Sequence, residues 1–123
     1  LEKFIEVKER NYDYYVQALH GKNGLEILPF RTDIRANKWF YSVLLKDCGK
    51  STDDILAGMS EAKIQTRPIW KLISDLEPYK GAQCADLSNA HYYFARVVNI
   101  PCTTNLTLED AAVVADRLLE ITE

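Results

Sequence analysis

The segment 65–71 holds the residues of this chain whose types and spacing best suit ligand binding. Arg67 and Lys71 lie on either side of Pro68, which stiffens the backbone, and Trp70 lies between them. A guanidinium and an ammonium group beside an indole face can hold a carboxylate or a phosphate against an aromatic wall. The same residues also suit a solvated rim with one packed tryptophan. The spacing alone leaves both interpretations open.

The histidines and the other aromatic residues have structural explanations. His20 and His91 are far apart and lack partners at metal-ligand spacing. We expect His91 to be a hydrogen-bonded core residue, and His20 to lie against a helix C-terminus. Trp39 and the pair at 92–93 can stack on a ligand, but aromatic side chains of a small domain usually fill its core.

No catalytic constellation is visible in the sequence. The five glycines are scattered, none opens a helix after a strand, and no serine lies in a G-x-S-x-G context. Cys48, Cys84 and Cys102 are widely spaced, so they predict neither a disulfide framework nor a zinc site, and we expect three half-buried thiols. A complete small enzyme is therefore the least supported class, and we predict no metal site.

Composition and net charge exclude several classes of binding partner. A chain of 123 residues with 47% apolar and 27% charged residues is an ordinary single globular domain. A net charge of −3 and the lack of any Lys/Arg run argue against a nucleic-acid binder. No apolar run approaches the roughly 20 residues that a membrane-spanning helix needs. We expect a soluble, cytoplasmic protein with neither nucleic acid nor membrane as a partner.

Helical spacing and capping signals place most of the helices. Apolar residues at intervals of three and four predict a long amphipathic helix over residues 1–19. Ser51 with Asp54, and Thr107 with Asp110, predict capping boxes that begin two further helices.

The remaining segments predict strands, one loop and one ambiguous element. Extended segments are expected at 25–30, at 39–45 and at 64–67, the last stopped by Pro68. The pattern predicts a loop with a helical turn at residues 69–81. It also predicts a following helix, with Asp86 or Ser88 as its N-cap. Residues 97–100 continue that helix or form a strand, because the following proline disfavours helix there.

Helices that alternate with short strands predict an α/β fold of the α+β type. We expect a two-layer sandwich in which four helices pack on a small, mostly antiparallel sheet. The irregular connections argue against a doubly wound parallel sheet.

Three segments in the right order resemble one family. TRPIWKLISDLEPY, at residues 66–79, is similar to the small-domain signature of the DegT/DnrJ/EryC1/StrS family of PLP-dependent nucleotide-sugar aminotransferases. The resemblance is closest to the branch that acts on 4-keto-6-deoxy sugars. NKWFYSVLL, at 37–45, is similar to the strand that follows the family's long helix. NIPCTTNLTLEDAAVVADRLLE, at 99–120, is similar to the family's ending, so the resemblance covers nearly the whole chain.

The resemblance implies that residues 1–123 are one domain, the C-terminal small domain of a fold-type-I aminotransferase. The opening Leu1-Glu2-Lys3-Phe4, already inside a helical pattern, agrees with a domain from a longer chain. The parent would bind pyridoxal 5'-phosphate (PLP) through a lysine of an N-terminal large domain, form a homodimer, and pass an amino group from a donor, usually glutamate, to a keto-sugar nucleotide. None of the large domain's motifs occurs here, so the fragment alone is expected to be inactive. The competing hypothesis is a stand-alone binding or interaction module.

The family pattern makes Arg67 and Trp70 the foremost substrate-binding residues, followed by Lys71 and Asn37, with no catalytic residue in this chain. Arg67 would offer a fork for a carboxylate or phosphate, and Trp70 a face for a sugar or base. Relatives often carry His where this chain has Ser74, so the resemblance leaves the acceptor sugar undefined.

Overall fold

The long helices begin and end close to where the sequence predicts. The computed structural model describes all of residues 1–123, with α1 at Glu2–Leu19, α2 at Thr52–Glu61 and α4 at Leu108–Thr122. Ser51 and Thr107 each accept a hydrogen bond from the backbone N–H three residues later, and the aspartate there accepts one from the cap backbone. Both capping boxes are therefore confirmed, and each satisfies two N–H groups that the helix itself cannot pair.

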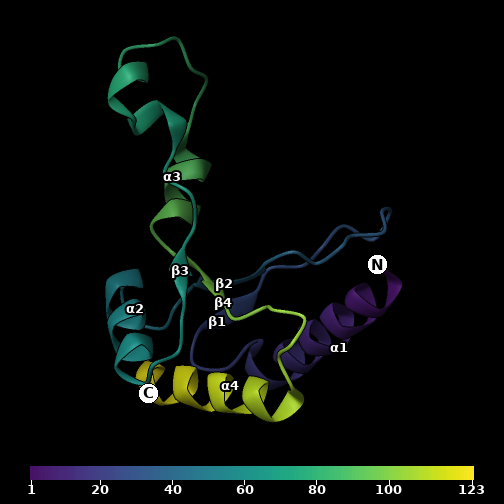
Figure 1. Ribbon diagram of the computed structural model, residues 1–123. Helices are drawn as coiled ribbons and strands as arrows, with labels where there is room; N and C mark the ends of the chain where they lie inside the picture. Colours follow the sequence, from purple (N-terminus) through teal and green to yellow (C-terminus); the bar gives the residue numbers. More distant parts are fainter.

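Four strands form one antiparallel sheet in the order β1-β2-β4-β3 (Figure 1). Every neighbouring pair is antiparallel. The predicted α+β fold with an antiparallel sheet is confirmed, and residues 97–100 are a strand. The strands are β1 (Leu25–Ile27), β2 (Tyr41–Leu45), β3 (Arg67–Pro68) and β4 (Val97–Ile100).

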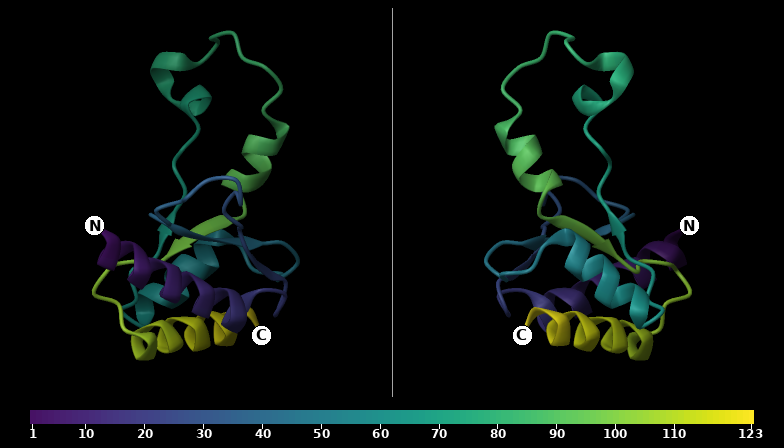
Figure 2. Two further views of the ribbon diagram at one scale, coloured as in Figure 1. Left: turned by 90° about the vertical axis from the view of Figure 1, so that its right-hand side faces the viewer. Right: turned by 90° about the vertical axis from the view of Figure 1, so that its left-hand side faces the viewer.

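Between β3 and β4 the chain leaves the sheet as a projecting arm, residues 69–96, while the rest of the molecule forms the body (Figures 1 and 2). The outward leg carries two single 3-10 turns, η1 (Ile73–Asp75) and η2 (Glu77–Tyr79), and the returning leg carries α3 (Ser88–Phe94). No residue of the arm is buried, so the hydrophobic core lies entirely in the body.

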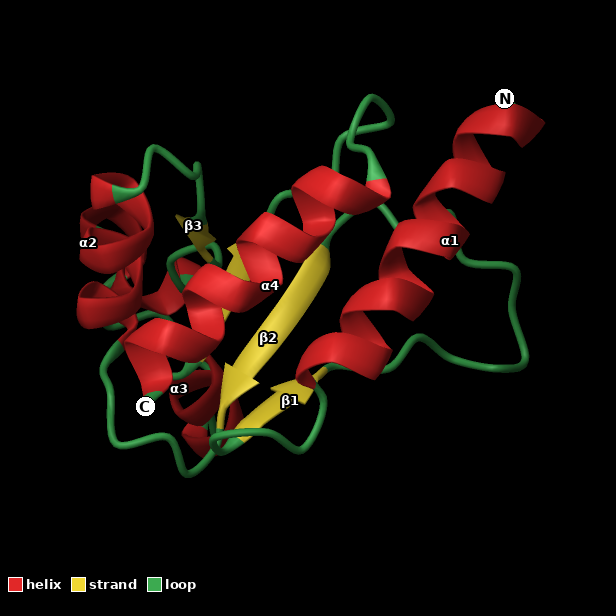
Figure 3. Cartoon of the chain, turned by 90° about the horizontal axis from the view of Figure 1, so that it is seen from below, coloured by secondary structure: helices red, strands yellow, loops and turns green.

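The core lies between one face of the sheet and the helices α1, α2 and α4, which all cover that face (Figure 3). Tyr41, Val43 and Leu45 of β2 point into it together with Val98 and Ile100 of β4. Their alternation with Ser42, Leu44 and Asn99 is the period-two pattern of a strand with two different faces. None of the helices is long and apolar enough to cross a lipid bilayer.

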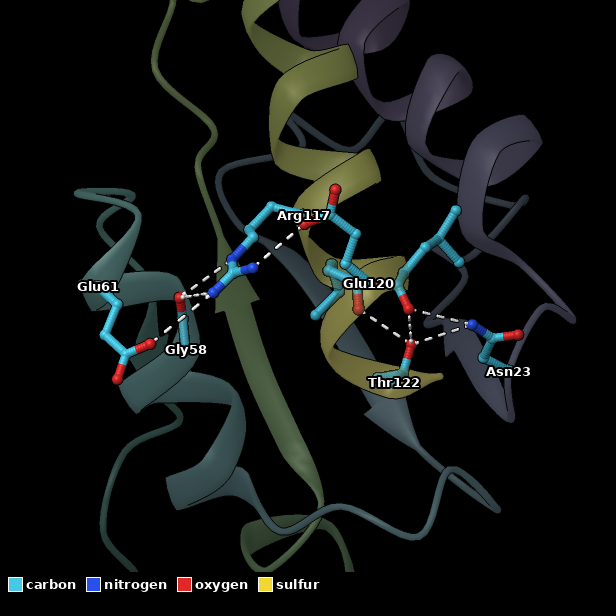
Figure 4. A network of polar contacts seen from close by, with 8 residues as sticks. Asn23, Gly58, Glu61, Arg117, Glu120 and Thr122 are labelled. Atoms are coloured by element: carbon cyan, nitrogen blue, oxygen red, sulfur yellow. Dashed lines mark hydrogen bonds and ion pairs between the residues drawn. The ribbon is translucent and has the colours of Figure 1, made fainter.

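Polar contacts of α4 fasten the helical layer (Figure 4). The Arg117 guanidinium donates through Nε and Nη2 to the Gly58 carbonyl of α2, at 3.3 and 3.2 Å, and also pairs with Glu120. At the other edge of α4, Asn23 donates to the Thr122 hydroxyl at 3.3 Å. The last turns of α4 are thus tied to α2 on one side and to the turn after α1 on the other.

The bounds of three strands differ from the sequence-based prediction. β1 ends at Ile27, although we expected it to reach residue 30, and β3 begins at Arg67, although we expected it to begin at residue 64. β3 includes Pro68, although we expected the strand to stop before it. β3 is an edge strand, and a proline is tolerated there because no outer neighbour needs its missing N–H group. β2 begins at Tyr41, so Trp39 and Phe40 precede it.

Several residues that we expected in the core or half-buried are exposed instead. His91, Tyr92 and Tyr93 lie on α3, which has no buried residue, and Trp39 is 64% exposed. Those expectations were wrong because they assumed that every apolar stripe of the chain finds a second layer within the chain. Cys84 on the arm is likewise exposed, whereas the other two thiols are half-buried as predicted.

Candidate functional site

A row of polar residues crosses the sheet face that the long helices leave open. In an antiparallel ladder, directly paired residues share a face. The register pairs Ser42 of β2 with Asn99 of β4, and Asn99 with Arg67 of β3. Because Val98 and Ile100 point into the core, these three side chains lie on the opposite face. They form a continuous polar row from the second strand to the edge of the sheet.

The end of this row opens into a hollow of about 630 Å3 at the foot of the arm. Three of the predicted substrate-binding residues, Arg67, Trp70 and Lys71, line it together, and Trp70 is 79% exposed. The structure therefore brings these three to one cavity. The full set of lining residues is Trp39, Phe40, Arg67, Pro68, Ile69, Trp70, Lys71 and Asn99.

The charge in this hollow is positive and unpaired. Every other arginine of the chain donates at least one side-chain hydrogen bond, to a carboxylate, a carbonyl or an amide. Arg67 donates none, Lys71 forms no ion pair, and no carboxylate lines the hollow. A free guanidinium with five N–H donors in this setting is suited to a carboxylate or a phosphate.

Trp39 and Phe40 form the wall opposite the arm. Their rings stack with centroids 4.8 Å apart and planes 21° apart. Asn37 does not line the hollow; its side-chain oxygen accepts a hydrogen bond from the Trp39 backbone N–H at 3.2 Å. Lys38, between them, has a left-handed backbone with φ of 47°, which turns the chain toward the wall.

Lys8 of α1 anchors the same wall. Its ammonium group donates to the Trp39 carbonyl at 2.9 Å and to the Cys102 carbonyl at 2.6 Å. The Tyr41 hydroxyl donates to the Lys8 carbonyl at 2.8 Å, and burial raises the pKa of this hydroxyl, which keeps it protonated as a donor. These three contacts join α1 to the wall, to the start of β2 and to the loop after β4, which are distant from it in sequence.

Sequence reasoning missed Asn99 and assigned Trp39 to the core. Asn99 is the polar residue of the strand VVNI, which is otherwise apolar, and that exception was a usable signal. Its position next to Arg67 depends on the register of β3 and β4, which the sequence does not reveal. Ser74 lies outside this hollow and lines a second one of about 520 Å3 on the arm, shared with Trp70 and Lys71.

The sequence model of the DegT/DnrJ/EryC1/StrS aminotransferase family matches residues 1–119. The chain belongs to this family. A curated relative named as a pyridoxal phosphate-dependent aminotransferase, EpsN from Bacillus subtilis (strain 168), is 25% identical over 131 residues. The match covers 98% of this chain and 32% of EpsN.

Solved structures of other proteins share the fold. DesI, crystallised in the presence of its TDP-sugar product, superimposes with a TM-score of 0.87 at 24% identity, over 96% of this chain and 31% of DesI. The sugar aminotransferase CalS13 from Micromonospora echinospora gives a TM-score of 0.81 at 21% identity, over 94% of this chain and 30% of CalS13. The chain thus spans about a third of the length of these relatives.

Proposed function

We propose that this chain is the C-terminal small domain of a PLP-dependent aminotransferase that transfers an amino group, usually from glutamate, to a keto-sugar nucleotide. Family membership and the one-third coverage of longer relatives support this division into a small domain and a larger remainder. The observation that carries the proposal is the unpaired Arg67 beside Lys71 in an aromatic hollow without a carboxylate. That hollow suits an anionic sugar substrate.

The cofactor would be held by the remainder of the parent chain. When bound, PLP supplies the electron sink of the reaction. A lysine must lose its proton before it attacks the carbonyl group of PLP, and burial favours that loss. Every lysine of this chain is at least partly exposed, so the residues here do not fit covalent attachment of PLP. Lys46 shows the opposite tendency, since the hydrogen bond from its ammonium group to Glu26 raises its pKa.

The work of this domain would be to bind and orient the substrate. Arg67 and Lys71 would hold an anionic group, and Trp70 would offer its face to the sugar or the base. Asn37 would act by fixing the Trp39 wall through the hydrogen bond to the Trp39 backbone.

The arm would pack against the N-terminal large domain of the parent. Its apolar side chains, among them Ile73, Leu76 and Tyr79, are exposed in this chain, and a monomeric surface rarely leaves so many large apolar groups together without a partner. We propose in addition, from the family resemblance, that the parent is a cytoplasmic homodimer.

The test uses the full-length parent with PLP bound. We expect glutamate to convert the PLP absorption band to that of the pyridoxamine form. Arg67→Ala should raise the KM for the glutamate donor or for the nucleotide sugar about 10-fold with little change in melting temperature, because Arg67 is exposed and unpaired. Arg31→Ala is the matched control, since Arg31 is also exposed but lies away from the hollow.

Two results would contradict the proposal. One is a parent whose PLP band does not respond to glutamate. The other is an Arg67→Ala variant that melts much earlier but keeps its kinetic constants, which would make Arg67 a structural residue.

A further inference from the structure

Asn99 has a polar group for which the chain supplies no partner. The side chain lies on the open sheet face, is only 9% exposed and lines the hollow. The Ser42 hydroxyl donates to its Oδ1 at 2.8 Å, which fixes the amide plane. The amide nitrogen of Asn99 donates to no other group of the chain. This nitrogen is not among the fully buried atoms of the chain, so the donor is free and open to a ligand in the hollow.

Arg67 lies directly opposite Asn99 in the β3–β4 ladder and presents the other free donor. Paired residues on one face of a sheet have Cβ atoms about 4.5–5.5 Å apart, and both of these side chains line the same hollow. Both are mounted on hydrogen-bonded strands, which hold binding groups more rigidly than loops do. No carboxylate of the chain competes for them there.

We propose that Asn99 and Arg67 together bind one oxyanion of the substrate, and that Ser42 is a positioning residue that turns the Asn99 amide nitrogen toward the hollow. The inference rests on the proposed function and adds a residue to that site. Two substrates can supply an oxyanion: the phosphates of the sugar nucleotide and the carboxylates of the amino donor. The space of about 630 Å3 and the walls of Trp39 and Trp70 favour the sugar nucleotide, since its rings can stack on indole.

The experiment measures binding by calorimetry on the full-length parent, with inorganic pyrophosphate and glutamate as the two probes. Asn99→Ala should weaken pyrophosphate binding about 10-fold, the usual value of one hydrogen bond to a charged group. The isosteric Asn99→Asp should weaken it further, because it places a negative charge against the anion, and it also serves if the alanine variant does not fold. Asn105→Ala, an exposed turn position outside the hollow, is the control and should bind as wild type.

Two variants of Ser42 test whether this residue orients the Asn99 amide. Ser42→Ala removes the hydroxyl that orients the amide and should weaken pyrophosphate binding about threefold, whereas Ser42→Thr keeps the hydroxyl and should restore it. A hydroxyl needed only for stability would change the melting temperature and leave the affinity of the folded protein unchanged.

Each outcome decides the inference. A loss of glutamate binding in place of pyrophosphate binding keeps the oxyanion site and assigns it to the amino donor. Wild-type affinity for both probes in both folded Asn99 variants overturns the inference, even where the parent transaminates. A parent that never responds to glutamate, yet binds pyrophosphate through Asn99, would overturn the proposed function alone.

Discussion

Tyrosines of the body and of the arm are the same residue type in opposite surroundings. Tyr15 and Tyr41 are fully buried, whereas Tyr79 and Tyr93 of the arm are about half exposed. The two regions differ in layering: the body places three helices against a sheet, while α3 has no second layer within the chain. Apolar composition therefore does not decide burial, and nothing in this chain buries the apolar side chains of the arm.

The largest effect that tests this contrast comes from truncating one apolar side chain in each region. Leu118→Ala removes a fully buried side chain of α4 and should lower the free energy of unfolding by about 4 kcal/mol. Ile73→Ala, at an arm position that is 67% exposed, should cost less than about 0.5 kcal/mol. Urea unfolding of both variants checks this. Equal costs would show that the arm belongs to the packed structure.

A sharper comparison of the two regions uses two glycines that have nearly the same backbone φ angle. Gly24 of the body and Gly81 of the arm have φ of 74° and 82°, so alanine strains both. A Cβ at Gly24 would lie 2.3 Å from the Asp47 backbone carbonyl carbon, whereas one at Gly81 would meet nothing within 4 Å.

We therefore expect Gly24→Ala to cost about 3 kcal/mol of unfolding free energy and Gly81→Ala about 1 kcal/mol. Thermal melting of the two variants gives the difference. If Gly81→Ala destabilised the chain as much as Gly24→Ala, the arm would be as tightly constrained as the body.

The smallest expected effect is a pH dependence that arises in the body. Burial raises the pKa of Tyr15, whose hydroxyl makes no hydrogen bond, so the unfolded chain loses this proton at a lower pH than the folded chain. The contribution to stability is complete below about pH 10 and should fall by about 1 kcal/mol for each pH unit above it.

Tyr15→Phe should reduce that alkaline decline by about half, because burial also raises the pKa of Tyr41, and Tyr79→Phe in the arm should leave it as in the wild type. Urea titrations at pH 8 and pH 11 provide the measurement. An unchanged decline in Tyr15→Phe would locate the pH dependence elsewhere in the molecule.

Much of the fold was predictable because its signals are local. The capping boxes at Ser51 and Thr107 specify helix starts within four residues, and the apolar spacing of α1 gives its buried face. The errors at His91 and Trp39 have a different origin. Both lie in patterns that normally imply a core, and only the tertiary arrangement shows that nothing in this chain covers them.

The residues of the candidate site likewise differ in whether the sequence could predict their grouping. Arg67, Trp70 and Lys71 are close in sequence, so their grouping could be predicted. Asn99 joins them only through strand pairing across a long insertion, and Trp39 comes from a third segment held by Lys8. Contacts of that range depend on register, which one sequence does not specify.

The arm leaves the sheet after Pro68 and returns at Val97, and these two points lie on neighbouring strands. Neighbouring strands are about 4.8 Å apart, a gap that a two-residue turn can bridge. The arm is thus, from the standpoint of the body, an exchangeable connection. A change in the length or the sequence of the arm would therefore leave every residue of the hydrophobic core cluster in place.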